Sequence, residues 1–183
     1  MIKLLLVRHG ETDFNKAKIV QGHKNIDLNK NGIYQAIELG KFMLDNDIKC
    51  DEIYSSPLIR AQKTANLIKE YAKLTPEIVI NSSIIERDFK EYEGANITSE
   101  IVKKLSLPYL ENTEQLSDVY DRAYNFINNL KDNNQTVLIV THSHVIRTIL
   151  KHIDENYTFK EKLDNCKLVE LYFENGNFIK NKE

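Results

Sequence analysis

LLLVRHGET, residues 4–12, joins an apolar segment directly to a polar end. Leucine and valine run up to Val7, and Arg8, His9 and Gly10 follow at once. Such an apolar run is typical of a strand buried in a parallel sheet, and ligands of open α/β sheets bind outside the carboxyl ends of strands. Arginine offers phosphate a rigid fork of donors, and histidine can attack phosphorus. The segment therefore indicates a phosphate site at a strand end, although an ordinary strand end with a surface Arg and His would have the same sequence.

The rest of the chain alternates short β-rich segments with longer helical patterns, which is typical of a parallel sheet flanked by helices. Near the carboxyl end, Lys167 to Phe173 and Phe178-Ile179 flank an Asn-Gly turn, which predicts an antiparallel hairpin. We therefore expect a single-domain, three-layer α/β/α fold with a mostly parallel sheet and an antiparallel C-terminal edge. The strands expected from the pattern before this hairpin are Ile2–Val7, Glu52–Ser55, Ile78–Ile80 and Thr136–Val140.

Apolar residues at helical spacing predict the helices between these strands. Ser56 and Pro57 fit the cap and the first position of the second helix. Residues 81–111 have weak periodicity and are expected to form a loop with a short helix over the strand ends. The predicted apolar stripes are Ile33, Ala36, Ile37, Gly40 and Leu44; Ala61, Thr64, Ala65, Ile68 and Tyr71; Leu116, Val119, Tyr120, Ala123, Phe126, Ile127 and Leu130; and Val145, Ile146, Ile149, Leu150 and Ile153.

Length and composition narrow the class of protein. The 183 residues suit one domain, 1–183, and a net charge of -2 gives no overall attraction to nucleic acid. No apolar run approaches the roughly 18 residues of a membrane span, and the amino terminus is too short for a secretory signal, so a cytoplasmic protein without a membrane partner is expected. Cys50 and Cys166 have no ligand or disulfide spacing and are expected to be reduced structural thiols.

Three further polar groups are expected at the same sheet edge as Arg8 and His9. Arg60 and Glu86 come shortly after expected strands, and His142 follows the strand 136–140. Taken singly, an arginine on a helix or a glutamate in a loop is usually a solvated surface charge. Together they supply cations, imidazoles and a carboxyl group, which are the groups that phosphoryl transfer without a metal requires.

At this point the sequence resembles the histidine phosphatase superfamily, the phosphoglycerate mutase-like proteins. The resemblance spans most of the chain in order. The matching blocks are RHGETDFN at 8–15, QGHKNIDLNKNG at 21–32, SSPLIRAQKTA at 55–65, the E-R-D-F…E-G segment at 86–94 and THSHVIR at 141–147.

The resemblance and the chemistry of the residues imply the same roles. His9 attacks phosphorus through one ring nitrogen while the other donates to a backbone carbonyl, and Glu86, with a raised pKa, protonates the leaving group and then activates water. Arg8, Arg60 and His142 surround the phosphoryl group. The resemblance also places Asn15 and the backbone N–H of Ser143 at the phosphate, and Gln21 and Gly22 are expected there too.

Alternatives remain at this stage. His142 and His144 can form half of a metal site, since imidazoles two apart on a strand share a face, but no further ligands complete it, and we expect neither a metal nor a cofactor. His23 either reaches the substrate or faces solvent. The family commonly has glycine where this chain has Ser143 and Lys90; Ser143 still supplies its N–H, and Lys90 reads best as a solvated loop residue.

The expected function is a cofactor-independent phosphomonoesterase that forms phosphohistidine on His9 and acts on a small-molecule phosphate monoester. A phosphoglycerate mutase is the alternative, and a catalytically silent phosphate-binding module is the second. No arginine lies between Arg87 and Arg122, so this segment offers few cations for a second, closed anion pocket. Water should therefore reach the phosphohistidine, which favours a phosphatase over a mutase. The sequence identifies neither the physiological substrate nor the oligomeric state.

Overall fold

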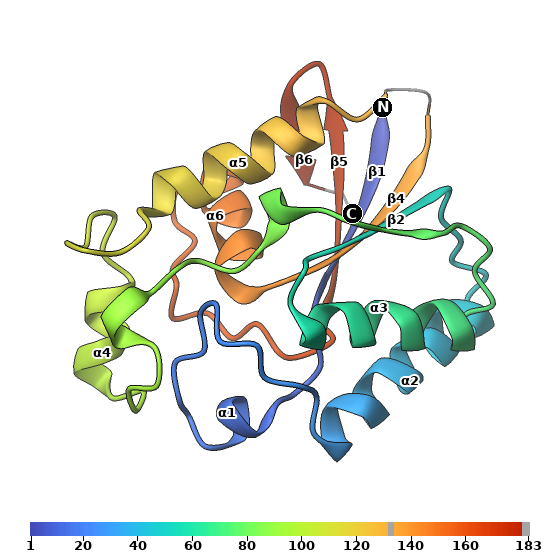
Figure 1. Ribbon diagram of the computed structural model, residues 1–183. Helices are drawn as coiled ribbons and strands as arrows, with labels where there is room; N and C mark the ends of the chain where they lie inside the picture. The colour runs from blue at the N-terminus through green and yellow to red at the C-terminus, as the bar shows by residue number, and fades with distance from the viewer. Residues whose placement is uncertain (132–133, 181–183) are drawn as a thin grey trace.

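The computed structural model describes residues 1–131 and 134–180, and a six-stranded sheet forms its centre (Figure 1). The strands are β1 (Ile2–Arg8), β2 (Glu52–Ser55), β3 (Ile78–Ile80), β4 (Thr136–Thr141), β5 (Leu168–Glu174) and β6 (Asn177–Lys180). Their order across the sheet is β3-β2-β4-β1-β5-β6, with β1 to β4 parallel and both β5 and β6 antiparallel to their neighbours. The predicted mostly parallel sheet with an antiparallel C-terminal edge is confirmed, and β1 and β4 each run one residue further than expected.

Helices cover both faces of this sheet and give three layers. Figure 1 shows α2 and α3 on one side and α5 and α6 on the other, with α1 and α4 outside these layers. The α-helices are α1 (Asp13–Lys16), α2 (Lys30–Asp45), α3 (Ile59–Tyr71), α4 (Ser99–Leu105), α5 (Leu116–Asn128) and α6 (Ser143–Ile153), and η1 (Ser82–Ile84) and η2 (Lys90–Tyr92) are 3-10 turns. The α/β/α architecture is therefore as predicted.

The apolar run of β1 is explained by burial on both faces. Leu4 and Leu6 pack in the cluster formed with α5 and α6, whereas Leu5 and Val7 pack in the cluster formed with α2 and α3. Alternate side chains of a strand point to opposite faces, so a central strand covered on both sides needs apolar residues at every position. β1 therefore carries His9 into the interior of the molecule at its carboxyl end.

Two local predictions on the helices are wrong. In α2 the predicted Ala36 and Gly40 are buried, but the stripe omitted Leu39 and Met43, which are buried, and included Leu44, which is exposed. The predicted stripe lay to one side of the true buried face, because Leu44 falls about 100° further round the helix than Met43. Helix α3 begins at Ile59 without a side-chain cap, not at Pro57 with Ser56 as its cap.

The C-terminal hairpin matches its prediction. Asn175 and Gly176 join β5 to β6 with φ of 50° and 76°, the left-handed conformation that a two-residue type I′ turn requires. The Tyr124 hydroxyl donates to Gly176 O at 3.0 Å and docks this turn on α5.

Among residues 1–131 and 134–180, none of the helices combines the length and the apolar character needed to cross a membrane.

Candidate active site

His9 directly follows β1 and is fixed by its backbone and by its ring. Its N–H donates to Thr141 O at the end of β4 at 3.0 Å. Its Nδ1 lies 2.7 Å from Gly10 O, and because a carbonyl only accepts, the ring proton is on Nδ1 and the lone pair on Nε2. Burial, followed by the charges of Arg60 and Arg8, holds the pKa of His9 well below its ordinary value. The side chain is thus a neutral imidazole, the form that a nucleophile needs.

The turn after His9 requires glycine. A Cβ on Gly10 would lie 2.5 Å from the carbonyl oxygen of Gly32, at the start of α2. The Gly10 N–H donates to Thr64 Oγ1 at 3.0 Å, which links the turn to α3. This close approach of backbone to backbone explains why glycine follows the histidine.

Arg60 reaches His9 from the first turn of α3. Its Nε donates to His9 Nε2 at 3.3 Å, and its two terminal nitrogens each donate at 2.7 Å, to Gly22 O and Lys24 O. Burial lowers the pKa of Arg60 to about 10, although the carboxylate of Glu86 raises it, so the guanidinium stays charged at neutral pH. The predicted cation lies beside the predicted nucleophile.

Arg8 brings a second guanidinium to the same place. Its Nη1 donates to Leu163 O, while its Nε is buried and has no partner among the described residues. Desolvation lowers the pKa of Arg8, and the nearby carboxylate of Glu86 raises it. A buried donor without a partner is costly, and an anion bound here would satisfy it.

His142 caps the start of α6 and packs against the nucleophile. Its ring centroid is 5.1 Å from that of His9, and its Nε2 lies 2.6 Å from Ser56 Oγ. The side chain is fully buried, and burial together with Arg60 lowers its pKa well below the ordinary value. Its Nδ1 is buried without a described partner. Ser56, predicted as a helix cap, therefore fixes this imidazole instead.

Glu86 is a buried carboxyl group on the loop after η1. Its Oε1 accepts from the N–H of Arg87 at 2.9 Å and from the N–H of His144 at 3.2 Å. Burial raises the pKa of Glu86, while these N–H groups and the charges of Arg60 and Arg8 oppose the rise. The direction is the one predicted for a proton donor.

Long-range hydrogen bonds hold the Glu86 loop in place. Thr141 Oγ1 donates to Ile84 O at 2.7 Å, which ties the end of β4 to η1. Arg122 of α5 donates to Ser83 O at 2.7 Å and to Glu86 O at 3.2 Å. Arg122 also forms an ion pair with Glu114 at 2.7 Å. The carboxyl group is thus supported by two elements distant in sequence.

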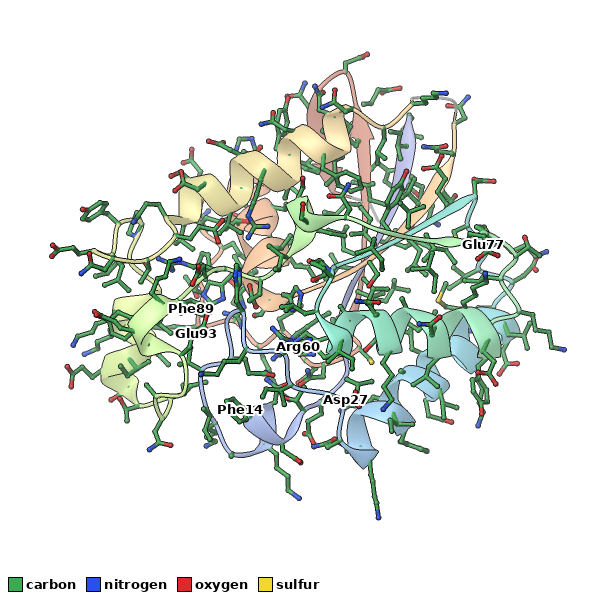
Figure 2. All side chains as sticks on the ribbon, viewed as in Figure 1. Phe14, Asp27, Arg60, Glu77, Phe89 and Glu93 are labelled. Atoms are coloured by element: carbon green, nitrogen blue, oxygen red, sulfur yellow. The ribbon has the colours of Figure 1, made fainter. Side chains whose placement is uncertain are left out.

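A cavity of about 260 Å³ joins these groups. Every predicted site residue lines it except His142, which lies against His9. In Figure 2, Arg60 lies near the middle of the molecule, and Phe89 and Glu93 lie together on its α4 side. The lining residues are Arg8, His9, Asn15, Ile19, Val20, Gln21, Gly22, Arg60, Glu86, Phe89, Ile97, Val102, Leu105, Ser106, Ser143, His144, Arg147 and Phe159. The lining therefore combines arginine, histidine and glutamate side chains with a larger set of apolar ones.

Glu93 has a supporting role that the sequence did not indicate. Its Oε1 accepts from the His23 N–H at 2.7 Å, and Gly22 beside it has φ of 51°. A Cβ on Gly22 would lie 2.0 Å from that same Oε1. Glu93 and Gly22 together therefore fix the loop whose carbonyls hold Arg60.

The residues left open by the sequence now have positions. His23 Nε2 lies 2.8 Å from Glu86 O, so His23 contacts the Glu86 backbone. Lys90 is 60% exposed, pairs with Asp88 at 2.5 Å, and has φ of 50°, the left-handed conformation that glycine adopts without strain. Its reading as a solvated loop residue agrees with this exposure. Ser143 is the first residue of α6 and has ordinary helical backbone.

Sequence reasoning missed Arg147 and the role of His144. Arg147 lines the cavity from α6 and donates to the carbonyl oxygens of Phe159 and Glu161, while its Nε is buried without a described partner. The His144 ring packs edge-on against Phe89, with ring centroids 4.9 Å apart. The only available signal was the helical spacing of Arg147 from Ser143, which places both on one face.

No further metal ligands join His142 and His144 in the part of the chain that the structure describes. The ring of His142 is bonded to Ser56, and that of His144 packs between Phe89 and Phe159. Within residues 1–131 and 134–180, no three or more His, Cys, Asp or Glu side chains come together as metal ligands. Cys50 and Cys166 are free, and burial raises the pKa of each thiol to about 12.

Comparison with known proteins gives one family. The model of the histidine phosphatase superfamily (branch 1) matches residues 4–182. The uncharacterized phosphatase PhoE of Bacillus subtilis (strain 168) is 34% identical over 184 residues, which cover 100% of this chain and 91% of PhoE. The 2,3-bisphosphoglycerate-dependent phosphoglycerate mutase of Streptococcus mutans is 46% identical, but over 72 residues, 39% of this chain and 31% of the mutase.

Solved structures agree in fold. A phosphoserine phosphatase variant from Entamoeba histolytica, crystallised with phosphoserine, has a TM-score of 0.81 and 28% identity, with 98% of this chain and 94% of that chain covered. A structure of the E. histolytica phosphatase with 3-phosphoglyceric acid has a TM-score of 0.80 and the same identity and coverage.

Proposed function

The chain belongs to the histidine phosphatase superfamily and is an enzyme that acts as a phosphatase, and from this premise we propose that it passes the phosphoryl group of a monoester through His9 to water. One observation carries the proposal: a neutral His9, with its lone pair on Nε2, lies beside Arg60 in a cavity that also contains buried Glu86. Nucleophile, cation and proton donor are therefore close together and need no metal to act.

In the first step, the lone pair of His9 Nε2 attacks phosphorus and the bond to the ester oxygen breaks. Arg8 and Arg60 neutralise the charge of the phosphoryl oxygens, and His142 holds the ring of His9 in place. The leaving oxygen takes a proton from Glu86, which burial keeps protonated to higher pH than an exposed glutamate. Both backbone donors contact Oε1, so we assign this proton to Oε2. The products are phosphohistidine and the free alcohol.

In the second step, the carboxylate of Glu86 takes a proton from water as the water oxygen attacks phosphorus. The phosphorus–nitrogen bond breaks, inorganic phosphate leaves, and both His9 and Glu86 return to their starting states. The donors proposed for phosphate are the Asn15 amide and the backbone N–H of Ser143 at the start of α6, and Gln21 and Gly22 line the same cavity.

A small-molecule phosphate monoester is the proposed substrate class. The E. histolytica relative binds phosphoserine and 3-phosphoglyceric acid, both of which are alkyl phosphates of modest size. An organic leaving group is supported by the apolar residues Phe89, Val102 and Leu105, which line the same cavity as the arginines.

The first test is hydrolysis of 4-nitrophenyl phosphate with and without EDTA. We expect turnover in both, whereas inhibition by EDTA that a divalent metal reverses would replace this mechanism with a metal-dependent one.

Phosphoglycerate mutase activity is the second candidate, favoured by the short stretch shared with the streptococcal mutase. The two functions separate when 3-phosphoglycerate is supplied with its bisphosphorylated primer and both inorganic phosphate and 2-phosphoglycerate are followed. We expect inorganic phosphate to predominate, because a mutase must keep water from the phosphohistidine. Predominant isomerisation would make the enzyme a mutase.

A further inference from the structure

A second cavity lies next to the one that contains His9. It measures about 670 Å³ against about 260 Å³ for the first. Its walls are α4, the start of α5, the end of α6 and the loop 157–160, and Figure 1 shows α4 standing away from the sheet beside these helices. The lining residues are Val102, Lys103, Ser106, Leu107, Pro108, Leu116, Ser117, Tyr120, Thr148, Lys151, His152, Tyr157, Thr158, Phe159 and Lys160. None of the steps proposed above uses this space.

The two cavities share one wall. Val102, Ser106 and Phe159 line both of them, so the two spaces are adjacent. On the catalytic side, the Phe159 ring lies 5.5 Å from that of His144, whose backbone N–H binds Glu86. A substrate held by its phosphoryl group at His9 therefore has a second space within reach of its other end.

The second cavity is positive at its rim. Lys103, Lys151 and Lys160 are exposed and line it, and its described lining contains no aspartate or glutamate. None of these three lysines forms an ion pair with a described residue; Lys151 donates instead to the backbone carbonyl of Glu155. In a chain with a net charge of -2, the side chains that line this cavity thus carry positive and no negative charge, and the carboxylates whose charges act on lining residues, Asp121 and Glu161, lie outside the lining. Complementarity of charge favours an anionic occupant.

Apolar and aromatic side chains make up much of the rest of this lining. Tyr120 stacks on His152 with ring centroids 4.5 Å apart and planes 22° from parallel. Leu107, with 48% of its surface exposed, lines the same space as Pro108 and Leu116. Exposed apolar surface of this kind is stabilised by covering it with an apolar or aromatic group.

We propose that the second cavity holds the leaving-group end of an extended phosphate monoester, one whose alcohol is largely aromatic or apolar and carries negative charge at its far end. The proposal rests on the phosphatase function above and adds the class of substrate. The phosphoryl group binds at Arg8, His9 and Arg60, the organic part passes the shared wall, and the distal anion meets Lys103 and Lys151. The second cavity then selects among substrates by their leaving groups, and none of its residues takes part in the reaction at phosphorus.

A matched series of aryl phosphates tests this on the full chain. The substrates are biphenyl-4-yl phosphate with a neutral, a carboxylate or a trimethylammonium group at the 4′ position, and 4-nitrophenyl phosphate is the short reference. The wild type should favour the carboxylate ester over the ammonium ester by about fivefold in kcat/KM, the scale of exposed ion pairs. The Lys103→Glu/Lys151→Glu variant should reverse this preference while its kcat/KM for 4-nitrophenyl phosphate stays unchanged.

The control carries the same change of net charge on α2 and the loop that follows it. Lys41→Glu/Lys49→Glu replaces two exposed lysines that do not line either cavity, and it should keep the wild-type preference. The Lys103→Glu/Lys151→Glu protein is called the rim variant. The proposal is overturned if the wild type hydrolyses the three biphenyl esters equally well, or if the rim variant has the same preference as the wild type.

Binding separates this proposal from the proposed function. The methylphosphonate analogue of the carboxylate ester cannot be hydrolysed, and calorimetry should show it binding the wild type about fivefold more tightly than the rim variant. If 4-nitrophenyl phosphate is not hydrolysed but this difference is found, the phosphatase function fails and the second cavity stands. Equal Kd values for the wild type and the rim variant overturn the second cavity whether or not turnover occurs.

Discussion

Nε of Arg60 lies 3.3 Å from Nε2 of His9 and points its proton at the histidine lone pair. The opposite ring nitrogen, Nδ1, is held by Gly10 O at 2.7 Å. Protonating His9 would therefore place a second positive charge directly against the guanidinium, in a site where the imidazole is only 2% exposed. The contact with Arg60 therefore disfavours protonation of His9 Nε2. It also places a cation beside the nitrogen that the phosphoryl group must approach.

Replacing His9 with alanine should abolish turnover, because no other imidazole of the cavity offers a free Nε2 beside Arg60. We expect kcat for 4-nitrophenyl phosphate to fall at least about 10³-fold, the usual result of removing a nucleophile. Rapid quenching of the wild type with a ³²P-labelled substrate should trap a label that is stable to alkali and lost in acid. His152→Ala changes an exposed residue of α6 that lines the second cavity but not the one around His9, and with 4-nitrophenyl phosphate, which is too short to need that cavity, it should keep both kcat and the label. Turnover in wild type without any label would rule out the covalent route.

Glu86→Gln should affect poor leaving groups most. An alkoxide needs a proton when it departs, so kcat for phosphoserine should fall about 10²- to 10³-fold, and that for 4-nitrophenyl phosphate much less. The pKa of Glu86 is raised by burial and that of His9 is lowered. In the wild type, kcat/KM for alkyl esters should thus persist as pH falls through 6.5, where an ordinary histidine is protonated, and should decline as pH rises through the raised pKa of Glu86. The variant should lose this decline with rising pH, and equal losses of kcat for both substrates would contradict the role of Glu86 as proton donor.

Local sequence predicted those parts of the site that depend on local structure. The run into Arg8 and His9 reads as a strand end because β1 is buried on both faces, and strand ends in a parallel sheet meet at one edge. The positions of Arg60 and Glu86 were predicted in the same way, because both residues come shortly after strands of this sheet. The hairpin followed from Asn175-Gly176, since two consecutive left-handed residues favour this pair.

The errors occur where partners are distant in sequence. Ser56 looks like a helix cap beside a proline, but its hydroxyl contacts His142, 86 positions away, and α3 begins later. Arg147 looks like an ordinary helical arginine until the loop around Phe159 folds over it and receives its hydrogen bonds. In α2, Leu44 and Met43 are equally apolar, and only the position of the sheet decides that Met43 is buried. Such choices are made by tertiary packing and carry no local signal.

Acid should destabilise the fold through the buried imidazoles. His9 and His142 are 2% and 0% exposed, and their pKa values are lowered mainly by burial. Above pH 6.5 neither state binds the proton, but below it the unfolded chain protonates both rings while the folded protein does not. The free energy of unfolding should therefore fall as pH drops below about 6.5, by about 1.4 kcal/mol per pH unit for each histidine.

Denaturant titrations at several pH values test this dependence. His142→Gln keeps an amide near Ser56 and should reduce the pH dependence of the free energy of unfolding by one proton, that is by about 1.4 kcal/mol per pH unit. Glu86 acts in the opposite direction, since its raised pKa makes the folded state bind a proton that the unfolded state releases. Glu86 is present in both the wild type and His142→Gln, so its contribution cancels in the comparison. Identical slopes for the wild type and His142→Gln would mean that His142 is protonated in the folded protein.

Gly22→Ala should impair activity through Arg60. Gly22 has φ of 51°, and an added Cβ would lie 2.0 Å from Glu93 Oε1, so either the loop or Glu93 has to move. The left-handed backbone alone costs about 1–2 kcal/mol for a residue other than glycine. Movement of the loop also displaces Gly22 O, which holds Arg60 Nη2 at 2.7 Å. Because small misplacements of catalytic groups have large effects on rate, kcat should fall about tenfold or more.

Gly94→Ala is the matched control for this variant. Gly94 also has positive φ, 97°, but a Cβ there meets only Lys24 Cε at 3.6 Å. It should therefore lower the melting temperature through strain while leaving kcat close to that of the wild type. The two variants are compared at equal concentrations of folded enzyme. If both lose the same fraction of kcat, the effect is general strain, and the carbonyl of Gly22 does not position Arg60.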